Sequence, residues 1–147
     1  MQRTDQPAAL RISRHYPVAA EKIWRAWTDP QALSQWFGPG QTPSLTKAEI
    51  DLREGGRYCI AFTTPDGQPN QVAGVYQTVQ PHSRLVFTWA WHSTPERVSR
   101  VSIELNPVAG GTEMIFVHDR FFDESARARH GQGWIAFFSN LDRYLEA

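Results

Sequence analysis

Residues 84–91 read RLVFTWAW, and their alternation is typical of a β-strand. Every second side chain is large and apolar: Leu85, Phe87, Trp89 and Trp91. Burial of each such side chain is worth roughly 1.5–3 kcal/mol, so three aromatic rings together represent about 5–9 kcal/mol. The net stability of a domain is only about 5–15 kcal/mol, so this face must be covered. Either a thick core lies over it, or it lines a cavity that a ligand fills.

Strand-like alternation extends on both sides of this stretch. It covers residues 46–91, interpreted as four strands, and continues through 97–105 and the segment around Phe116. Residues 9–16 form a further predicted strand near the N-terminus. The turns between strands are Gly55-Gly56, Pro65-Asp66-Gly67, Pro81-His82-Ser83 and Ala109-Gly110-Gly111. Hairpins of this kind predict a mostly antiparallel sheet, because tight turns join antiparallel neighbours.

Two short segments after the first strand have helical spacing. Residues 19–29 place apolar side chains three and four positions apart, but Ala19 offers no capping side chain. Asp29 and Pro30 suit the N-cap and first helical position of a second helix. Gly38-Pro39-Gly40 is expected to end it.

The C-terminal segment predicts a long helix that begins after an N-cap at Asp123. Its apolar stripe consists of Trp134, Phe137, Phe138, Leu141 and Leu145. Gly131 and Gly133 lie inside this helix, where each costs about 1 kcal/mol relative to alanine. We therefore expect a kink or a close approach to the sheet at these glycines.

The predicted order is one strand, two short helices, six strands and a long helix. We predict an α+β fold in which a curved sheet covers the apolar stripe of the last helix. One domain is expected over residues 1–147, with residues 1–7 disordered. We expect Leu85, Phe87, Trp89 and Trp91 to face the helix and Cys59 to face away from it.

Charge and composition narrow the function classes. The chain has 15 basic and 15 acidic residues, so no net charge favours nucleic acid or an anionic membrane. The single cysteine excludes an internal disulfide. The N-terminal residues lack the apolar core of a signal peptide, and no stretch reaches the ~20 apolar residues of a membrane span. We expect a soluble cytoplasmic protein.

Motifs for metal, nucleotide or nucleophilic chemistry are missing from the sequence. The five histidines show no paired spacing typical of metal ligands. The double glycines lie between strands, where hairpin turns explain them. No serine has a nucleophile-elbow context, and Cys59 reads as a small strand residue. We therefore predict no metal, no cofactor and no covalent intermediate.

Three polar side chains share a face with apolar neighbours and are expected to point inward. His118 follows Met114 and Phe116 at every second position, so it is either a core histidine or a group that orients a ligand. A role for His118 as general base is a weaker alternative. Tyr58 and Tyr76 present the same choice between core packing and ligand contact.

The succession of these segments resembles a known family. The matching stretches, in order, are AAEKIWRAWTDPQALSQWFGP, DLREGGRY, Gly74, PHSRLVFTWAW, GGTEMIFVH and GWIAFFSNL. Together they resemble START-like, Bet v 1-like (SRPBCC) proteins, in the branch related to the C-terminal domain of the activator of Hsp90 ATPase. The resemblance implies a helix-grip fold, a seven-stranded antiparallel sheet around a long C-terminal helix. It also implies a hydrophobic cavity, in which relatives carry lipids, sterols or polyketides and some cyclise polyketides.

Three functions remain open. The protein is interpreted first as a carrier or sensor of an apolar small molecule, which is not catalytic. The alternatives are a cyclase or aromatase that uses a pocket histidine or tyrosine, and a co-chaperone-like interaction module. A protein partner or a homodimer is left open as well.

The predicted ligand contacts are the inward-facing residues of the sheet, the helix stripe and an aromatic lid at Trp36 and Phe37. The full set is Trp27, Trp36, Phe37, Tyr58, Ile60, Phe62, Tyr76, Phe87, Trp89, Trp91, Val101, Ile103, Phe116, His118, Trp134, Phe137, Phe138 and Leu141.

Overall fold

The computed structural model describes residues 8–38 and 45–146. The elements in chain order are β1 (Leu10–Tyr16), α1 (Ala20–Thr28), α2 (Pro30–Leu33), β2 (Leu45–Ile50), β3 (Arg57–Thr63), β4 (Pro69–Gln80), β5 (Arg84–Trp91), β6 (Ser99–Val108), β7 (Gly111–Asp119) and α3 (Glu124–Glu146). This is the predicted order of elements. The expectations for residues 1–7 and for the helix end at Pro39 and Gly40 lie outside the described residues.

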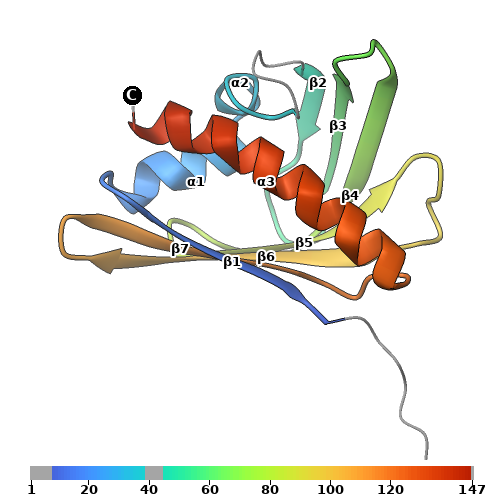
Figure 1. Cartoon of the computed structure of the whole chain (residues 1–147). Coiled ribbons are helices and arrows are strands. Elements are labelled where there is room, and N and C mark those ends of the chain that lie inside the picture. The colour runs from blue at the N-terminus through green and yellow to red at the C-terminus, as the bar shows by residue number, and fades with distance from the viewer. Residues whose placement is uncertain (1–7, 39–44, 147) are drawn as a thin grey trace, which may run out of the picture.

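The strands form a seven-stranded sheet in the order β1-β7-β6-β5-β4-β3-β2, and every neighbouring pair is antiparallel. Figure 1 shows the sheet curving around α3, with α1 and α2 beside one end of that helix. The predicted α+β helix-grip architecture is therefore confirmed. No helix among the described residues is long and apolar enough to cross a membrane.

The large side chains at alternate positions of β5 lie in the interior or at its edge, and Val86 on the opposite face is buried as well. Leu85, Phe87 and Trp89 are buried, and Trp91 at the strand end is half-buried. Different elements pack on Trp89 and Phe87. The Trp89 ring lies 5.0 Å from the ring of Trp134 on α3, whereas the Phe87 ring packs on tyrosines of β3 and β4. The expectation that the whole stripe faces α3 therefore holds at the end of the strand, where Trp89 lies.

The neighbouring strand β3 separates its faces as predicted. Tyr58, Ile60 and Phe62 are buried, whereas Cys59 is half-buried on the opposite face. There the Gln71 side chain lies 3.0 Å from the Cys59 sulfur.

The pairing of β4 with β5 is irregular. The pairing register shifts between Tyr76 and Thr78, and the Val75 amide donates to the Thr88 hydroxyl at 2.8 Å. A Cβ atom on Gly74 would lie 2.0 Å from the Thr88 carbonyl oxygen. Only glycine allows the two backbones to come this close, so Gly74 is required for the close pairing of β4 and β5 at this point.

Helix capping follows the sequence closely. The Asp29 carboxylate accepts a hydrogen bond from the Gln31 amide at 3.1 Å, and the Asp123 carboxylate accepts one from the Ala126 amide at 2.8 Å. The N-cap of α1 is Ala19, which provides no side-chain hydrogen bond. The two predicted caps and the predicted weak start of α1 are thus confirmed.

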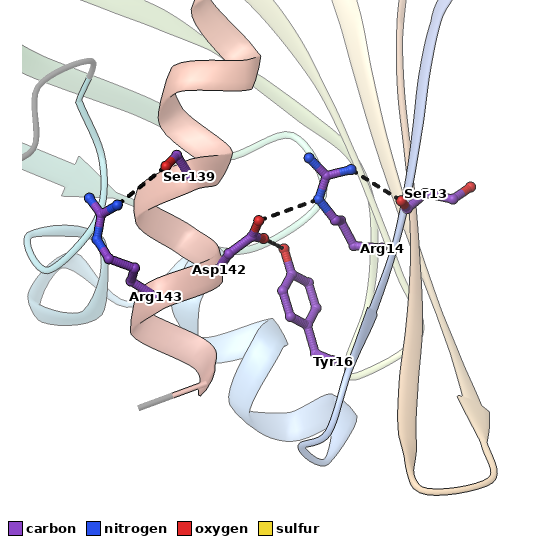
Figure 2. A network of polar contacts seen from close by, with 6 residues as sticks. All are labelled: Ser13, Arg14, Tyr16, Ser139, Asp142 and Arg143. Atoms are coloured by element: carbon purple, nitrogen blue, oxygen red, sulfur yellow. Dashed lines mark hydrogen bonds and ion pairs between the residues drawn. The ribbon is translucent and has the colours of Figure 1, made fainter.

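Polar contacts attach α3 to the edge strand β1. The Tyr16 hydroxyl donates to the Asp142 carboxylate at 2.6 Å, and Arg14 lies 3.6 Å from the other carboxylate oxygen, as Figure 2 shows. Burial and the Asp142 carboxylate raise the pKa of Tyr16 above its ordinary range. Nearer the start of the helix, a Cβ on Gly131 would lie 3.3 Å from a methyl group of Leu10. The expected close approach to the sheet therefore occurs at Gly131.

Candidate ligand-binding cavity

The principal candidate site is a cavity of about 450 Å³ between the first half of α3 and the ends of β3, β4 and β5. Side chains from three parts of the chain surround it: these strand ends, the β5–β6 connection and α3. The lining residues are Phe62, Thr64, Asn70, Trp89, Trp91, Ser93, Thr94, Arg97, Arg129, His130, Gly133, Trp134 and Phe137.

Aromatic rings form the apolar side of the cavity. The Trp89 ring lies 5.0 Å from Trp134 and 5.5 Å from Trp91, measured between ring centroids. The Phe62 ring lies 5.7 Å from Phe137 and 6.0 Å from Trp91. These distances are typical of edge-to-face and tilted aromatic contacts, which hold the rings in place. The apolar side is therefore a rigid surface of sheet and helix side chains.

Polar and cationic side chains complete the lining. The Arg97 guanidinium lies over the ring of Phe122 at 3.8 Å from its centroid, and its Nε is 3.9 Å from the Glu96 carboxylate. Arg129 donates to the Ser125 hydroxyl at 2.6 Å. No aspartate or glutamate belongs to the described lining, so its formal charges are all positive.

His130 holds one of the wall aromatics in place. Its Nε2 accepts a hydrogen bond from the Trp91 indole at 2.9 Å, and its Nδ1 lies 2.7 Å from the Ala126 carbonyl, to which it donates. Both nitrogens are satisfied by a neutral ring with its proton on Nδ1. Burial lowers the pKa of His130; the Ala126 carbonyl opposes this, and the positive charge of Arg129 adds to it.

His118 lies outside this lining. It is fully buried and hydrogen-bonded through both ring nitrogens, to Ser99 and to Trp134. These contacts give it the role of a core histidine whose partners are two side chains. A direct contact between His118 and a ligand remains a prediction that requires rearrangement of these bonds.

Five of the predicted contacts meet in the cavity: Phe62, Trp89, Trp91, Trp134 and Phe137. A much smaller void of about 20 Å³ collects a further six: Trp27, Phe37, Tyr58, Ile60, Tyr76 and Phe87. The remaining members pack in the core: Trp36, Val101, Ile103, Phe116, His118, Phe138 and Leu141.

Trp36 and Phe37 do not form the expected lid at the mouth of this cavity. They are 0% and 1% exposed, and the Trp36 indole donates to the Ala26 carbonyl at 2.9 Å. Tyr58 is engaged in a similar way, since its hydroxyl donates to the Thr88 carbonyl at 2.6 Å. Burial, followed by the neighbouring Tyr76, raises the pKa of Tyr58, so this phenol stays protonated.

Sequence reasoning missed the polar part of the lining: Thr64, Asn70, Ser93, Thr94, Arg97, Arg129, His130 and Gly133. Helical spacing could have found some of it, because positions 129, 133 and 137 share one face of α3. A search for apolar side chains alone does not find Arg129, because its side chain is charged. No periodicity points to Arg97, which lies in the connection between β5 and β6.

The described residues contain no group of three or more His, Cys, Asp or Glu side chains placed to hold a metal ion. The described lining of the cavity offers an aromatic surface, hydroxyl and amide groups, and cations.

Solved structures with the same fold cover nearly all of the chain. Protein CV1439 from Chromobacterium violaceum is 26% identical, with a TM-score of 0.82 over 96% of this chain and 99% of that protein. The AHSA1 protein from Silicibacter pomeroyi is 28% identical, with a TM-score of 0.81 over 94% of this chain and 97% of that one. Protein NE0264 from Nitrosomonas europaea is 27% identical, with a TM-score of 0.78 over 93% of each chain. No curated protein matches the chain at a significant level.

A family model described as "Activator of Hsp90 ATPase homolog 1-like protein" matches residues 17–146. The match extends from the end of β1 to the last turn of α3, so it includes every segment that lines the cavity. The chain belongs to this family of activator of Hsp90 ATPase homolog 1-like proteins, within the SRPBCC group of hydrophobic-ligand-binding folds.

Proposed function

We propose that the protein binds an apolar small molecule in the cavity between the sheet and α3, as a carrier or sensor. The observation that carries this proposal is the cavity of about 450 Å³ with its wall of aromatic rings. Ligand sites in proteins are typically concave, about 300–1,000 Å³ in volume, and mainly apolar with a few polar groups. The volume of the cavity lies in this range, and its aromatic rings give it an apolar wall beside its polar side chains.

Gly133 supports the interpretation that this space is retained for a ligand. It lies in the interior of α3 and lines the cavity, and a Cβ atom built on it would meet no other atom within 4 Å. A glycine inside a helix costs about 1 kcal/mol relative to alanine. A larger residue would stabilise the helix but would occupy part of the cavity. Glycine at this position therefore keeps the cavity open at a cost in helix stability.

A catalytic function is less well supported. An enzyme needs at least two groups that can exchange protons or attack a substrate within reach of one ligand. In the described lining His130 is the one candidate acid or base, but burial lowers its pKa and both of its nitrogens are already hydrogen-bonded. The arginines stay charged and serve binding better than proton transfer. The side chains of the cavity therefore suit ligand binding better than catalysis.

Fluorescence titration with N-phenylnaphthylamine, a neutral apolar probe, tests the proposal. Trp89, Trp91 and Trp134 line the cavity, so bound probe is expected to quench tryptophan emission and to gain fluorescence itself. Gly133→Leu places a side chain in the cavity and is expected to weaken probe binding at least tenfold, a loss of about 1.4 kcal/mol. Its unfolding midpoint should not fall, because a helix glycine has been removed.

Gln132→Leu is the matched control, since it adds the same side chain at an exposed position of α3. It should bind the probe as the wild type does. A folded wild type that binds no probe contradicts the proposal, and so does a Gly133→Leu variant that binds as tightly as the wild type. The first result would favour the interaction-module alternative, and the second would show that the probe binds elsewhere.

A further inference from the structure

The two arginines of the cavity come from separate parts of the fold. Arg97 belongs to the β5–β6 connection and Arg129 to α3, yet both line the same space. The chain as a whole has no net charge, with 15 basic and 15 acidic residues. The excess of positive charge in the described lining is therefore a local property of the cavity.

Neither arginine is neutralised by a close, buried carboxylate. None of the ion pairs between described residues involves Arg129, whose recorded side-chain bond goes to the uncharged Ser125 hydroxyl. Arg97 pairs with Glu96 at 3.9 Å, where the Glu96 side chain is 71% exposed. A long, exposed pair of this kind contributes little, so both guanidinium groups keep their capacity to bind an anion.

One aromatic residue of the lining carries a buried donor that lacks an acceptor. Trp89 lines the cavity and is 3% exposed, and its indole Nε1 has no hydrogen-bond partner in the described part of the chain. A buried donor without a partner is unfavourable. The indole of the neighbouring Trp91 already donates a hydrogen bond to His130, so of these two indoles only that of Trp89 lacks an acceptor.

We infer that the ligand is an amphipathic acid, with an aromatic or other apolar body and one carboxylate. The body lies against the aromatic wall, and the carboxylate is bound by Arg97 and Arg129. A guanidinium group matches a carboxylate with two parallel hydrogen bonds, which gives both strength and orientation. This inference rests on the proposed function and adds to it the chemical class of the ligand.

The test compares naphthaleneacetate with naphthaleneacetamide as competitors of N-phenylnaphthylamine. The two competitors have nearly the same shape and differ in charge. The wild type is expected to bind the acid about tenfold more tightly than the amide, as for a hydrogen bond to a charged group. Arg97→Gln and Arg129→Gln should each reduce this ratio about three- to tenfold and leave the affinity for the amide unchanged. Raising the salt concentration should weaken binding of the acid alone.

Arg143→Gln is the matched control, because Arg143 is an exposed arginine of α3 that does not line the cavity. It should retain the full preference for the acid. A wild type that binds the neutral probe but shows equal affinity for acid and amide overturns the inference while the proposed function stands. Equal losses in Arg143→Gln and Arg129→Gln would overturn it too, since they would indicate a general charge effect. If the neutral probe itself does not bind, the proposed function fails.

Discussion

The Trp134 indole donates a hydrogen bond to Nδ1 of His118 at 3.0 Å, and so joins α3 to β7 in the interior of the protein. On the other side of the ring, Nε2 lies 2.7 Å from the Ser99 hydroxyl, which itself donates to the Trp89 carbonyl at 3.1 Å. Because the Ser99 hydroxyl donates its one proton to the Trp89 carbonyl, Nε2 of His118 must be the donor in the contact between His118 and Ser99. His118 is held as the neutral tautomer that carries its proton on Nε2.

This arrangement predicts that acid destabilises the fold. Burial, followed by the neighbouring His130, lowers the pKa of His118 to about 2. Below about pH 6.5 the His118 side chain binds a proton in the unfolded chain but not in the folded protein. The free energy of unfolding therefore falls as the pH falls towards the pKa of His118 in the folded protein. The slope is about 1.4 kcal/mol per pH unit from this one group.

Urea denaturation of the wild type and of His118→Gln at several pH values measures this slope. The variant cannot titrate at position 118, so the stability advantage of the wild type should shrink by about 1.4 kcal/mol per unit below about pH 6. The carboxylates titrate in both proteins and cancel in the comparison. A difference that stays constant from about pH 7 to about pH 4 would show that His118 protonates freely.

The bond between Tyr16 and Asp142 predicts a contribution to stability at the C-terminal end of α3. Tyr16→Phe removes the hydroxyl that donates to the carboxylate at 2.6 Å, and is expected to cost about 1.5–3 kcal/mol in the free energy of unfolding. Arg14→Gln is the control, because its 3.6 Å pair with Asp142 is partly exposed and is worth only about 0–1 kcal/mol. Equal losses in the two variants would argue against a special role for the buried hydroxyl.

Helix capping gives a pair of opposite predictions. Asp29→Ala removes the acceptor of the Gln31 amide and is expected to lower stability by about 0.5–2 kcal/mol. Ala19→Ser adds a hydroxyl where the N-cap of α1 has extended backbone angles and no side-chain bond, so it should raise stability by a similar amount, about 0.5–2 kcal/mol. Chemical denaturation checks both. An unchanged midpoint and slope in either variant would mean that the cap at that position is not limiting.

Two glycines are expected to respond differently to the same substitution. Gly74→Ala forces a Cβ to within 2.0 Å of the Thr88 carbonyl oxygen and should destabilise the sheet by about 1–3 kcal/mol. Gly133→Ala meets no atom within 4 Å and should stabilise α3 by about 1 kcal/mol. Thermal unfolding of the two variants measures the contrast. A Gly74→Ala variant as stable as the wild type would indicate that β4 can move away from β5 without cost.

The sequence alone determined the elements and their inner faces. The alternation of residues 84–91, the carboxylates of Asp29 and Asp123 and the stripe from Trp134 to Leu145 depend on period and local hydrogen bonding. These are properties of a short segment, so they are readable before the chain folds. The resemblance to the family also predicted that the sheet wraps around the C-terminal helix.

Only the tertiary structure decided which inward side chains fill the core and which line the cavity. Phe87 and Trp89 share one face of β5, but Phe87 packs on Tyr58 and Tyr76, whereas Trp89 meets Trp134 at the cavity wall. That division depends on the bend of the sheet and the path of α3, which are set by contacts between segments far apart in sequence. For the same reason Arg97 and Arg129 meet at one cavity although no local pattern connects them.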